Sequence, residues 1–293
     1  MLFDQVFEYC ENEFERFDVC ATCSHPSGVC SGNCQTCLDE VHFQSTTDGK
    51  RADYECEKLL LCYVQRYALR YKNNICAAVE GIGLDRYPCF DILSIGCGAA
   101  PDLMAFEGFA GEKEVFYLGY DRNTRWENIH DYIEDCTGHI DNISATFRRR
   151  DIFEILAEGR PRGRSFNVIV VQFLISHLFN TGQNGRIDEL YTGLIRNVVS
   201  HRNAASPFLI IINDIDTYHK GRNLFYKLLD ALEDSGYNGT AIAYSNYANG
   251  DLGKTRWGGN KKRLGSLDYS YAPPPAGFEG AGLIIELNGG EDT

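Results

Sequence analysis

The sequence lacks any long apolar run. Its longest uncharged apolar stretches, residues 167–176 and 207–212, are far shorter than the roughly 20 residues that a membrane-spanning helix needs. The first 20 residues also lack the basic start and apolar stretch of a secretory signal, because they hold six acidic residues and one arginine. We therefore expect a cytoplasmic protein with no membrane partner.

An excess of positive charge is missing as well. The 293 residues carry a formal net charge of −13, so long-range attraction to nucleic acid or anionic lipid is not the default expectation. With 44% hydrophobic and 24% charged residues, the composition excludes a disordered chain and a fibrous repeat. A chain of this length is expected to form one or two domains.

Cysteine, in contrast, is abundant and concentrated near the N-terminus, where six of the twelve lie within the first 37 residues. In a reducing compartment, clustered thiols indicate a metal site more than disulfides. Two Cys-x2-Cys pairs, at 20–23 and 34–37, have the spacing of a tetrahedral zinc site. Four thiolates also suit an iron–sulfur cluster, which stays open as the alternative. The candidate metal ligands are Cys10, Cys20, Cys23, Cys30, Cys34 and Cys37.

Composition divides the chain into three parts. Residues 1–48 are acidic and cysteine-rich, with little apolar periodicity beyond Phe17, and are predicted to form a small module stapled by metal. Apolar residues three and four positions apart predict a helix over 53–80, within a helical linking segment at 49–87. From 88 to 293, short apolar runs alternate with helical stretches.

That alternation predicts a parallel sheet, because strands that alternate with helices form βαβ units. Strands are expected at 90–95, 115–119, 167–173, 207–212, 240–244 and 282–287. Helices are expected at 102–109, 124–136, 185–200 and 221–235. The predicted fold class is α/β, with a Rossmann-like, mostly parallel sheet, helices on both faces, and the small metal-stapled module at the N-terminus.

The strongest chemical signal is the turn after the first predicted strand. The apolar strand 91–95 runs into Gly96, Cys97 and Gly98 before a helix, and glycines there let the backbone turn sharply and approach a ligand closely. The second predicted strand leads to Asp121, 25 residues after Gly96, where a carboxylate can accept both hydroxyls of a ribose. The pattern therefore predicts a nucleotide site.

These residues resemble the class I S-adenosylmethionine (SAM)-dependent methyltransferases. The resemblance covers roughly residues 88–288 and includes the segments 150–153 and 167–178. Ser94 stands where many members have an acid, and Ala100 where many have a third glycine. The resemblance implies SAM as cofactor and methyl transfer as activity. It also implies that the helix in the linking segment 49–87 covers the cofactor. The cofactor contacts that it implies are Tyr67, Ile95, Gly96, Cys97, Gly98, Asp121, Arg122, Asp151, Ile152 and Gln172.

In similar enzymes the segment after the fourth strand of the sheet faces the methyl group. The predicted strand at 167–173 corresponds to that strand here. Gln172 and Phe173 are therefore expected to line the methyl-transfer site, and His177 serves either as a general base or as part of the helix that begins there. The Asn/Asp-Pro-Pro-Tyr/Phe tetrad used on adenine amines is absent, which argues against an adenine N6 methyltransferase. Asp214 or Asp216, after the predicted strand at 207–212, either orients a substrate or caps the following helix.

Two other functions stay open. One is a non-catalytic module that keeps SAM or another nucleotide as a structural ligand while the metal region docks a partner. The other is an NAD-type oxidoreductase, whose fingerprint has a third glycine where this chain has Pro101. Asp102, in the first turn of the following helix, would also repel a pyrophosphate, and this contrast favours SAM.

The methyl acceptor is RNA, a protein or a small molecule. A basic, glycine-rich segment near the C-terminus motivates RNA, since an exposed tryptophan beside cations can stack on a base while the cations hold phosphates. The residues predicted to make this contact are Lys254, Arg256, Trp257, Lys261, Lys262 and Arg263.

Replacing Lys261, Lys262 and Arg263 together by alanine tests the RNA contact. The loss of three phosphate-neutralising cations is expected to weaken RNA binding and to flatten the slope of log affinity against log salt by about 2. Fluorescence anisotropy at several salt concentrations measures both quantities. An unchanged affinity and an unchanged slope would exclude these residues from RNA binding.

Overall fold

The computed structural model describes residues 1–16, 33–43, 54, 56–161, 165–216, 224–245, 267–272 and 275–288. The strands are β1 (Phe90–Ile95), β2 (Val115–Tyr120), β3 (Ile143–Arg148), β4 (Val168–Gln172), β5 (Phe208–Asp214), β6 (Gly239–Tyr244), β7 (Leu267–Ala272) and β8 (Ala281–Leu287). The α-helices are α1 (Leu2–Arg16), α2 (Cys34–Phe43), α3 (Glu57–Val79), α4 (Pro101–Ala110), α5 (Glu127–Thr137), α6 (Ile152–Glu158), α7 (Leu174–Asn180), α8 (Asn184–Asn197) and α9 (Tyr226–Asp234). Short 3-10 helices are η1 (Leu84–Arg86), η2 (Thr124–Trp126) and η3 (Val199–His201).

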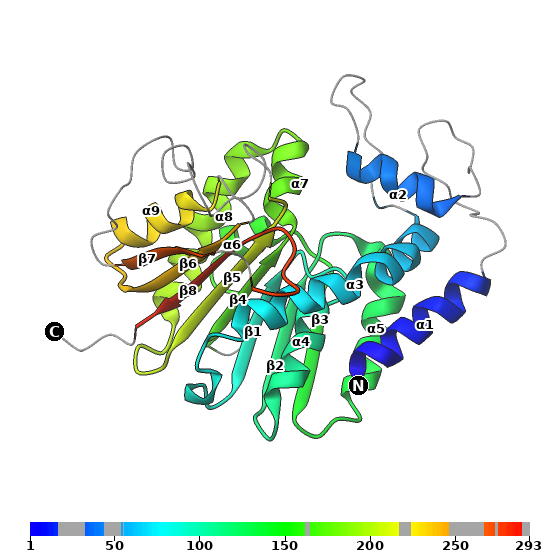
Figure 1. Ribbon diagram of the computed structural model, residues 1–293, viewed down its shortest axis with the longest axis horizontal. Helices are drawn as coiled ribbons and strands as arrows, with labels where there is room; N and C mark the ends of the chain where they lie inside the picture. Colours follow the sequence, from blue (N-terminus) through cyan, green and yellow to red (C-terminus); the bar gives the residue numbers. More distant parts are fainter. Residues whose placement is uncertain are drawn as a thin grey trace.

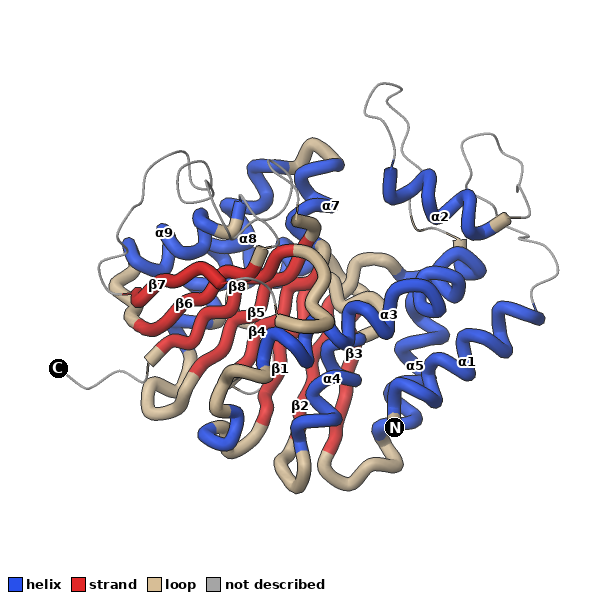
Figure 2. Tube along the Cα trace, in the orientation of Figure 1, coloured by secondary structure: helices blue, strands red, loops and turns tan. Residues whose placement is uncertain are grey.

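The described strands form one eight-stranded sheet in the order β3-β2-β1-β4-β5-β8-β6-β7 (Figure 1). Within this sheet β8 runs antiparallel to both of its neighbours, whereas the other pairs are parallel. Figure 2 shows the strands as one layer with helices on either side. The predicted α/β fold with a mostly parallel, Rossmann-like sheet is confirmed.

All six predicted strands are present as β1, β2, β4, β5, β6 and β8, each within two residues of its expected ends. The prediction misses β3 and β7, which lie at the two edges of the sheet. Strand β3 contains serine, threonine and arginine and is only partly buried, so it has no continuous apolar run. The expected helix at 53–80 is α3. The expected helices at 102–109, 185–200 and 221–235 are α4, α8 and α9, and the one at 124–136 is η2 followed by α5.

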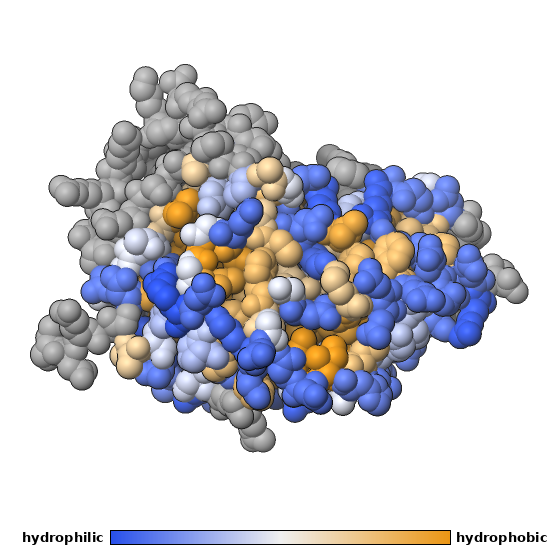
Figure 3. All heavy atoms as spheres, turned by 60° about the horizontal axis from the view of Figure 1, so that its bottom comes forward, coloured by the Kyte–Doolittle hydropathy of each residue, from blue (hydrophilic) through white to orange (hydrophobic). Residues whose placement is uncertain are grey.

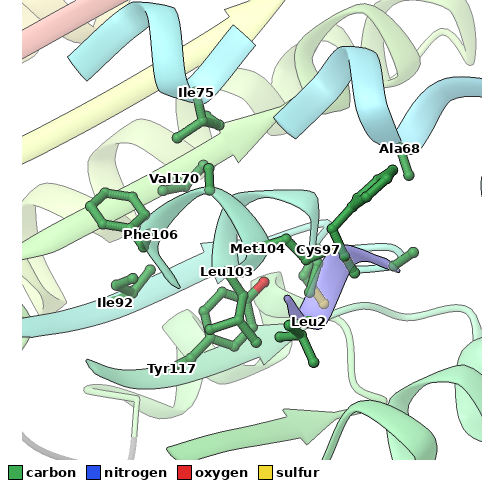
Figure 4. Close-up of a cluster of buried hydrophobic side chains, with 14 of the residues drawn as sticks. Leu2, Ala68, Ile75, Ile92, Cys97, Leu103, Met104, Phe106, Tyr117 and Val170 are labelled. Atoms are coloured by element: carbon green, nitrogen blue, oxygen red, sulfur yellow. The ribbon is translucent and has the colours of Figure 1, made fainter. Parts of the chain in front are cut away.

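One half of the core lies between the sheet and helices α1, α3, α4 and α5. Each fully buried leucine or phenylalanine there stabilises the fold by about 1.5–3 kcal/mol relative to an exposed side chain. Figure 4 shows part of this cluster, including Leu2, Ala68, Ile75, Ile92, Met104, Phe106, Tyr117 and Val170. A second cluster on the opposite face packs α6, α7, α8 and α9 against the alternate residues of β1, β4 and β5.

Helix α1 belongs to the first of these clusters. Leu2, Val6 and Cys10 are fully buried in the same cluster as Ile92 of β1. The backbone N–H of Leu2 donates to both carboxylate oxygens of Glu107, at 2.8 and 3.0 Å. The first helix of the predicted cysteine-rich module therefore packs into the core of the sheet.

The order of the strands indicates at which edge of the sheet a ligand can bind. Strand β1 pairs with β2 on one side and with β4 on the other, so the connections lead in opposite directions from β1. In open parallel sheets, ligands bind outside the carboxyl ends of the strands at such a switch point. The residues that follow β1, β2, β4 and β5 therefore gather at one edge of the sheet.

Large apolar side chains are mostly covered. Met1 and Leu69 are those that remain exposed within the described residues. Figure 3 shows one face of the molecule, on which hydrophobic residues form a band bordered by hydrophilic ones. In the part of the chain that the structure describes, no helix combines the length and the apolar character required to cross a bilayer.

Helix α3 is fixed against the segment before β8 by one buried amide. The Asn74 side chain donates to the carbonyl of Glu279 at 2.9 Å and accepts from the N–H of the same residue at 2.8 Å. Arg70, one turn earlier on α3, forms an ion pair with the Glu279 carboxylate at 2.8 Å. These contacts hold the helix across the sheet.

Replacing Asn74 by alanine is expected to lower the free energy of unfolding by about 2 kcal/mol, because it leaves two backbone groups of Glu279 without their partner. Urea unfolding measures the change. The neighbouring Asn73 is exposed on the same helix, so Asn73→Ala is the matched control and should be nearly neutral. Equal effects of the two substitutions would contradict the proposed anchor.

Candidate functional site

The turn after β1 has the backbone conformation that the glycines predict. Gly96 and Gly98 have φ values of 65° and 50°, and Ala100 at the N-cap of α4 has 54°. The N–H groups of Gly96 and Cys97 both donate to the carbonyl of Tyr120, at 2.8 and 3.1 Å. The turn is therefore attached to the end of β2.

Asp121 connects the turn to the residues after β2. One carboxylate oxygen accepts the N–H of Gly98 at 3.0 Å, and the other accepts the N–H of Asn123 at 2.9 Å. An ionised carboxylate can accept about four hydrogen bonds, so these two donors do not exhaust its capacity. Asp121 is half-buried, and it can hold the turn and still bind a diol.

The absence of a side chain at Gly119 allows the turn to approach β2 closely. A Cβ atom on Gly119 of β2 would lie 2.8 Å from the Sγ of Cys97, which is too short for any real contact. A Cβ atom on Gly98 would lie 3.5 Å from the ring of Trp126, an ordinary van der Waals distance. Gly119 therefore serves the packing of the turn, whereas Gly98 is required by its positive φ.

His130 of α5 contacts the turn through its imidazole ring. Its Nε2 lies 2.7 Å from the carbonyl of Gly98, and because a carbonyl only accepts, Nε2 carries the proton. The imidazole stacks on Phe147 of β3 at 4.1 Å. Burial lowers the pKa of His130 to about 4, so the ring is neutral at pH 7. No motif in the sequence pointed to this residue, since it lies in the middle of an amphipathic helix.

Asp102 faces the core rather than the ligand edge. Its carboxylate is 1% exposed and accepts a hydrogen bond from the hydroxyl of Tyr117 at 2.9 Å. The hydroxyl of Ser94, at the position where many methyltransferases have an acid, also bonds to it. Burial raises the pKa of Asp102 to about 6. A largely ionised acid beneath the N-terminus of α4 opposes the binding of an anionic phosphate there.

Aromatic residues of α3 lie along the same edge. Tyr63, Tyr67 and Tyr71 are four residues apart and share one face of the helix. The ring of Tyr63 meets Trp126 edge-on at 5.9 Å, and the ring of Tyr71 stacks on Phe173 at 4.1 Å. This tyrosine row therefore links the residues after β2 to the residue after β4. Tyr67, the predicted cofactor contact, is buried and stacks on Tyr71 at 5.6 Å.

The predicted methyl-transfer residues lie at the end of β4, with Gln172 as its last residue and Phe173 directly after it. The Gln172 side chain donates to the carbonyl of Tyr71 at 3.1 Å. Phe173 has a φ of 53°, which is uncommon and strained for a bulky residue and marks candidate functional positions. Both residues are half-buried. His177 lies one helical turn later on α7 and is also half-buried.

Asp214 caps a helix. Its carboxylate accepts the N–H of Ser176 at 2.9 Å and that of Ile215 at 2.7 Å. Ser176 lies in the first turn of α7, so Asp214 caps α7 and not the following helix α9. Burial raises the pKa of this carboxyl to about 6. Asp216 accepts a hydrogen bond from the hydroxyl of Ser245 at 3.0 Å.

The remaining predicted cofactor contacts also end strands. Asp151 follows β3, caps α6 through the N–H of Phe153 at 2.9 Å and forms an ion pair with Arg186 at 3.1 Å. Ile95 and Ile152 are buried, and Arg122 is exposed beside Asp121. The structure therefore places the predicted cofactor residues at the carboxyl ends of β1, β2, β3 and β4, with Tyr67 on α3.

The predicted metal ligands are only partly described. Cys20, Cys23 and Cys30 lie outside the described residues, as does the basic segment 254–263. Cys34 and Cys37 lie in the first turn of α2, against α3, whereas Cys10 is buried in the separate cluster around α1. Among the residues that the structure describes, no three His, Cys, Asp or Glu side chains gather to hold a metal ion.

Comparisons with known proteins find only distant similarities to solved structures. No family model and no curated protein matches the chain. The plantazolicin methyltransferase BpumL in complex with SAH is similar over 96% of this chain and 100% of its own, with 12% identity and a TM-score of 0.48. A putative O-methyltransferase from Nostoc punctiforme covers 79% of this chain and 59% of its own, with 11% identity and a TM-score of 0.46.

A third similar structure is a geranyl diphosphate methyltransferase in complex with GPP and sinefungin. It covers 80% of this chain and 82% of its own, with 10% identity and a TM-score of 0.40. Because these scores stay below 0.5, we infer what this chain does from its own residues.

The buried imidazole makes stability depend on pH. The pKa of His130 is about 4 in the folded protein and 6.5 as the ordinary value, so the unfolded chain binds more protons between these pH values. Stability from this residue is full above pH 6.5 and is lost as the pH falls toward 4. His130→Gln keeps a donor for Gly98 and should remove about 2–3 kcal/mol of this pH dependence.

Urea unfolding of both proteins at pH 7 and pH 4.5 measures the difference. Asp102 and Asp214 titrate in the opposite sense, because their folded pKa values of about 6 lie above the ordinary 3.8. Their contribution, which favours the fold at low pH, is shared by wild type and variant. Parallel pH profiles for the two proteins would contradict a neutral, buried His130.

Proposed function

We propose that the chain is a SAM-dependent methyltransferase. The observation that carries this proposal is the hydrogen bond between the Gly98 N–H and the Asp121 carboxylate. It joins a glycine turn and a diol-binding acid into one platform at the switch point of a parallel sheet. The non-catalytic module predicted as an alternative has no separate observation in its favour.

The residues at this edge suit SAM better than a dinucleotide. The buried acid Asp102 lies at the N-terminus of α4, where a pyrophosphate would need a positive environment. The tyrosine row and Phe173 offer aromatic faces, which favour a cationic sulfonium. The residues that would hold the cofactor are Tyr67, Ile95, Gly96, Cys97, Gly98, Asp121, Arg122, Asp151, Ile152 and Gln172.

When bound, SAM supplies an activated methyl group. The chain then needs chiefly to position the acceptor, and Gln172 and Phe173 lie where the methyl-transfer side of the site is expected. His177 is the proposed general base for an acceptor that must lose a proton. RNA, bound through the basic segment 254–263, is one proposed acceptor, beside a protein or a small molecule.

A metal role for the N-terminal cysteines is part of the proposal. Zinc, or an iron–sulfur cluster as the alternative, would be held by thiolates from Cys20, Cys23, Cys30, Cys34 and Cys37. Cys34 and Cys37 support it, because both lie in the first turn of α2. Metal analysis of the purified protein measures the bound ion directly.

Calorimetric titration with S-adenosylhomocysteine (SAH), the product form of the cofactor, tests the activity class. We expect micromolar binding of SAH and no binding of NAD. Asp121→Asn should weaken SAH binding about 30-fold, since it removes hydrogen bonds between ribose hydroxyls and a charged acceptor.

The exposed Asp141→Asn is the matched control for the loss of one negative charge and should leave the affinity unchanged. Melting temperatures of all three proteins separate a binding defect from a folding defect. NAD binding, or the absence of SAH binding to wild type, would refute the proposal.

A further inference from the structure

Three asparagine side chains are buried in the described part of the chain, and one of them is bonded differently. Asn74 uses both amide atoms on the backbone of Glu279. Asn167 likewise accepts from the N–H of Asp91 and donates to the carbonyl of Cys89, both at 2.8 Å. Asn213 is 1% exposed, yet neither its Oδ1 nor its Nδ2 has a partner among the described residues.

An unpartnered buried amide destabilises a fold, so its presence calls for a role. A leucine, whose side chain has the same branching and the same number of heavy atoms, would leave no polar atom unpartnered at this position. The other two asparagines show that amides elsewhere in this fold are fully used. Asn213 is therefore the exception that a bound group would explain.

Asn213 lies at the carboxyl end of β5, beside the proposed methyl-transfer site. It pairs with Gln172 of β4 on one side and with Gly282 of β8 on the other. Alternate residues of β5, including Ile211, pack in the cluster under α3, so Asn213 faces the same side of the sheet. The Gln172 side chain also faces α3, because it donates to the carbonyl of Tyr71. Two carboxamides therefore lie side by side at this edge.

An aromatic pair accompanies the two carboxamides. Tyr71 stacks on Phe173 at 4.1 Å, and Phe173 directly follows Gln172. The backbone N–H of Phe173 donates to the carbonyl of Asn213 at 2.9 Å, so the strained phenylalanine and the unpartnered amide are neighbours. A planar ring that stacks on the pair would bring its edge toward the amides.

A carboxamide offers one donor and one acceptor in a plane. It pairs in bidentate fashion with a group that presents the complementary pattern, as asparagine does with the edge of adenine. Unstacked bases of single strands are held in this way, by an aromatic ring on one face and polar groups at the edge.

We propose that the methyl acceptor is a nucleobase and that Asn213 reads its hydrogen-bonding edge while Phe173 stacks on its ring. This inference rests on the proposed methyltransferase function and names the substrate class of that site. Because Asn213 is 1% exposed, a base reaches its amide only when a side chain that covers it moves.

Thermal unfolding tests whether the amide is unpartnered. Asn213→Leu is expected to melt at or above the temperature of wild type, because an apolar side chain replaces unsatisfied polar atoms. The matched control is Asn167→Leu, which breaks two hydrogen bonds and should melt several degrees lower. A comparable loss for Asn213→Leu would mean that the amide serves the fold, and it would overturn the proposal.

Binding of short single-stranded oligonucleotides to SAH-saturated protein tests the ligand. Five-nucleotide RNAs of A, C, G or U, and an abasic strand of equal length, are titrated by fluorescence anisotropy. We expect at least one base to bind wild type more tightly than the abasic strand does. Asn213→Leu should bind that oligonucleotide at least tenfold more weakly than wild type does, whereas its affinity for SAH should stay within twofold of the wild-type value.

The outcomes separate the two proposals. Failure of wild type to bind SAH would overturn the methyltransferase function and this inference with it. Two results would overturn the inference alone, provided that wild type binds SAH. One is an oligonucleotide affinity that is the same for every base and for the abasic strand, and the other is an affinity that Asn213→Leu leaves unchanged. Methyl transfer to peptides rather than to oligonucleotides would do the same.

Discussion

The hydrogen bond from Gly98 to Asp121 is the contact on which the rest of the site depends. It fixes the glycine turn to the residue after β2 at 3.0 Å, and further contacts hold that geometry from several sides. His130 binds the carbonyl of Gly98 from α5, and the absence of a side chain at Gly119 leaves room for Cys97. The turn is therefore shaped by β1, β2 and α5 together, and a ligand meets a surface that is already formed.

A second constraint comes from α3, which lies across the carboxyl ends of the strands. Asn74 ties it to the segment before β8, and its tyrosine row reaches from Trp126 to Phe173. The same helix contacts α1 and α2, so the N-terminal part of the chain is continuous with the covering of the site. Two arginines on this helix form ion pairs, Arg66 with Asp39 and Arg70 with Glu279.

Much of the fold follows from the sequence because the central strands are buried on both faces and therefore read as continuous apolar runs. The glycine turn and Asp121 could also be predicted from the sequence. Glycines mark a turn that needs positive φ, and Asp121 comes just after a predicted strand. His130 and Asn213 left none, because their roles arise from contacts between elements distant in the chain. Asp214 shows the same limit: its position after β5 was evident, but the helix that it caps is α7, which precedes it by nearly forty residues in the sequence and is identified only by the 2.9 Å bond to Ser176.

Trp126 has a consequence of a different kind. It is one of only two tryptophans in the chain, is buried, and lies against both Gly98 and Tyr63. Indole emission is sensitive to the polarity and motion of its surroundings. The turn therefore carries its own optical reporter, and with Trp257 replaced by phenylalanine, changes at the site can be followed in real time without any added label.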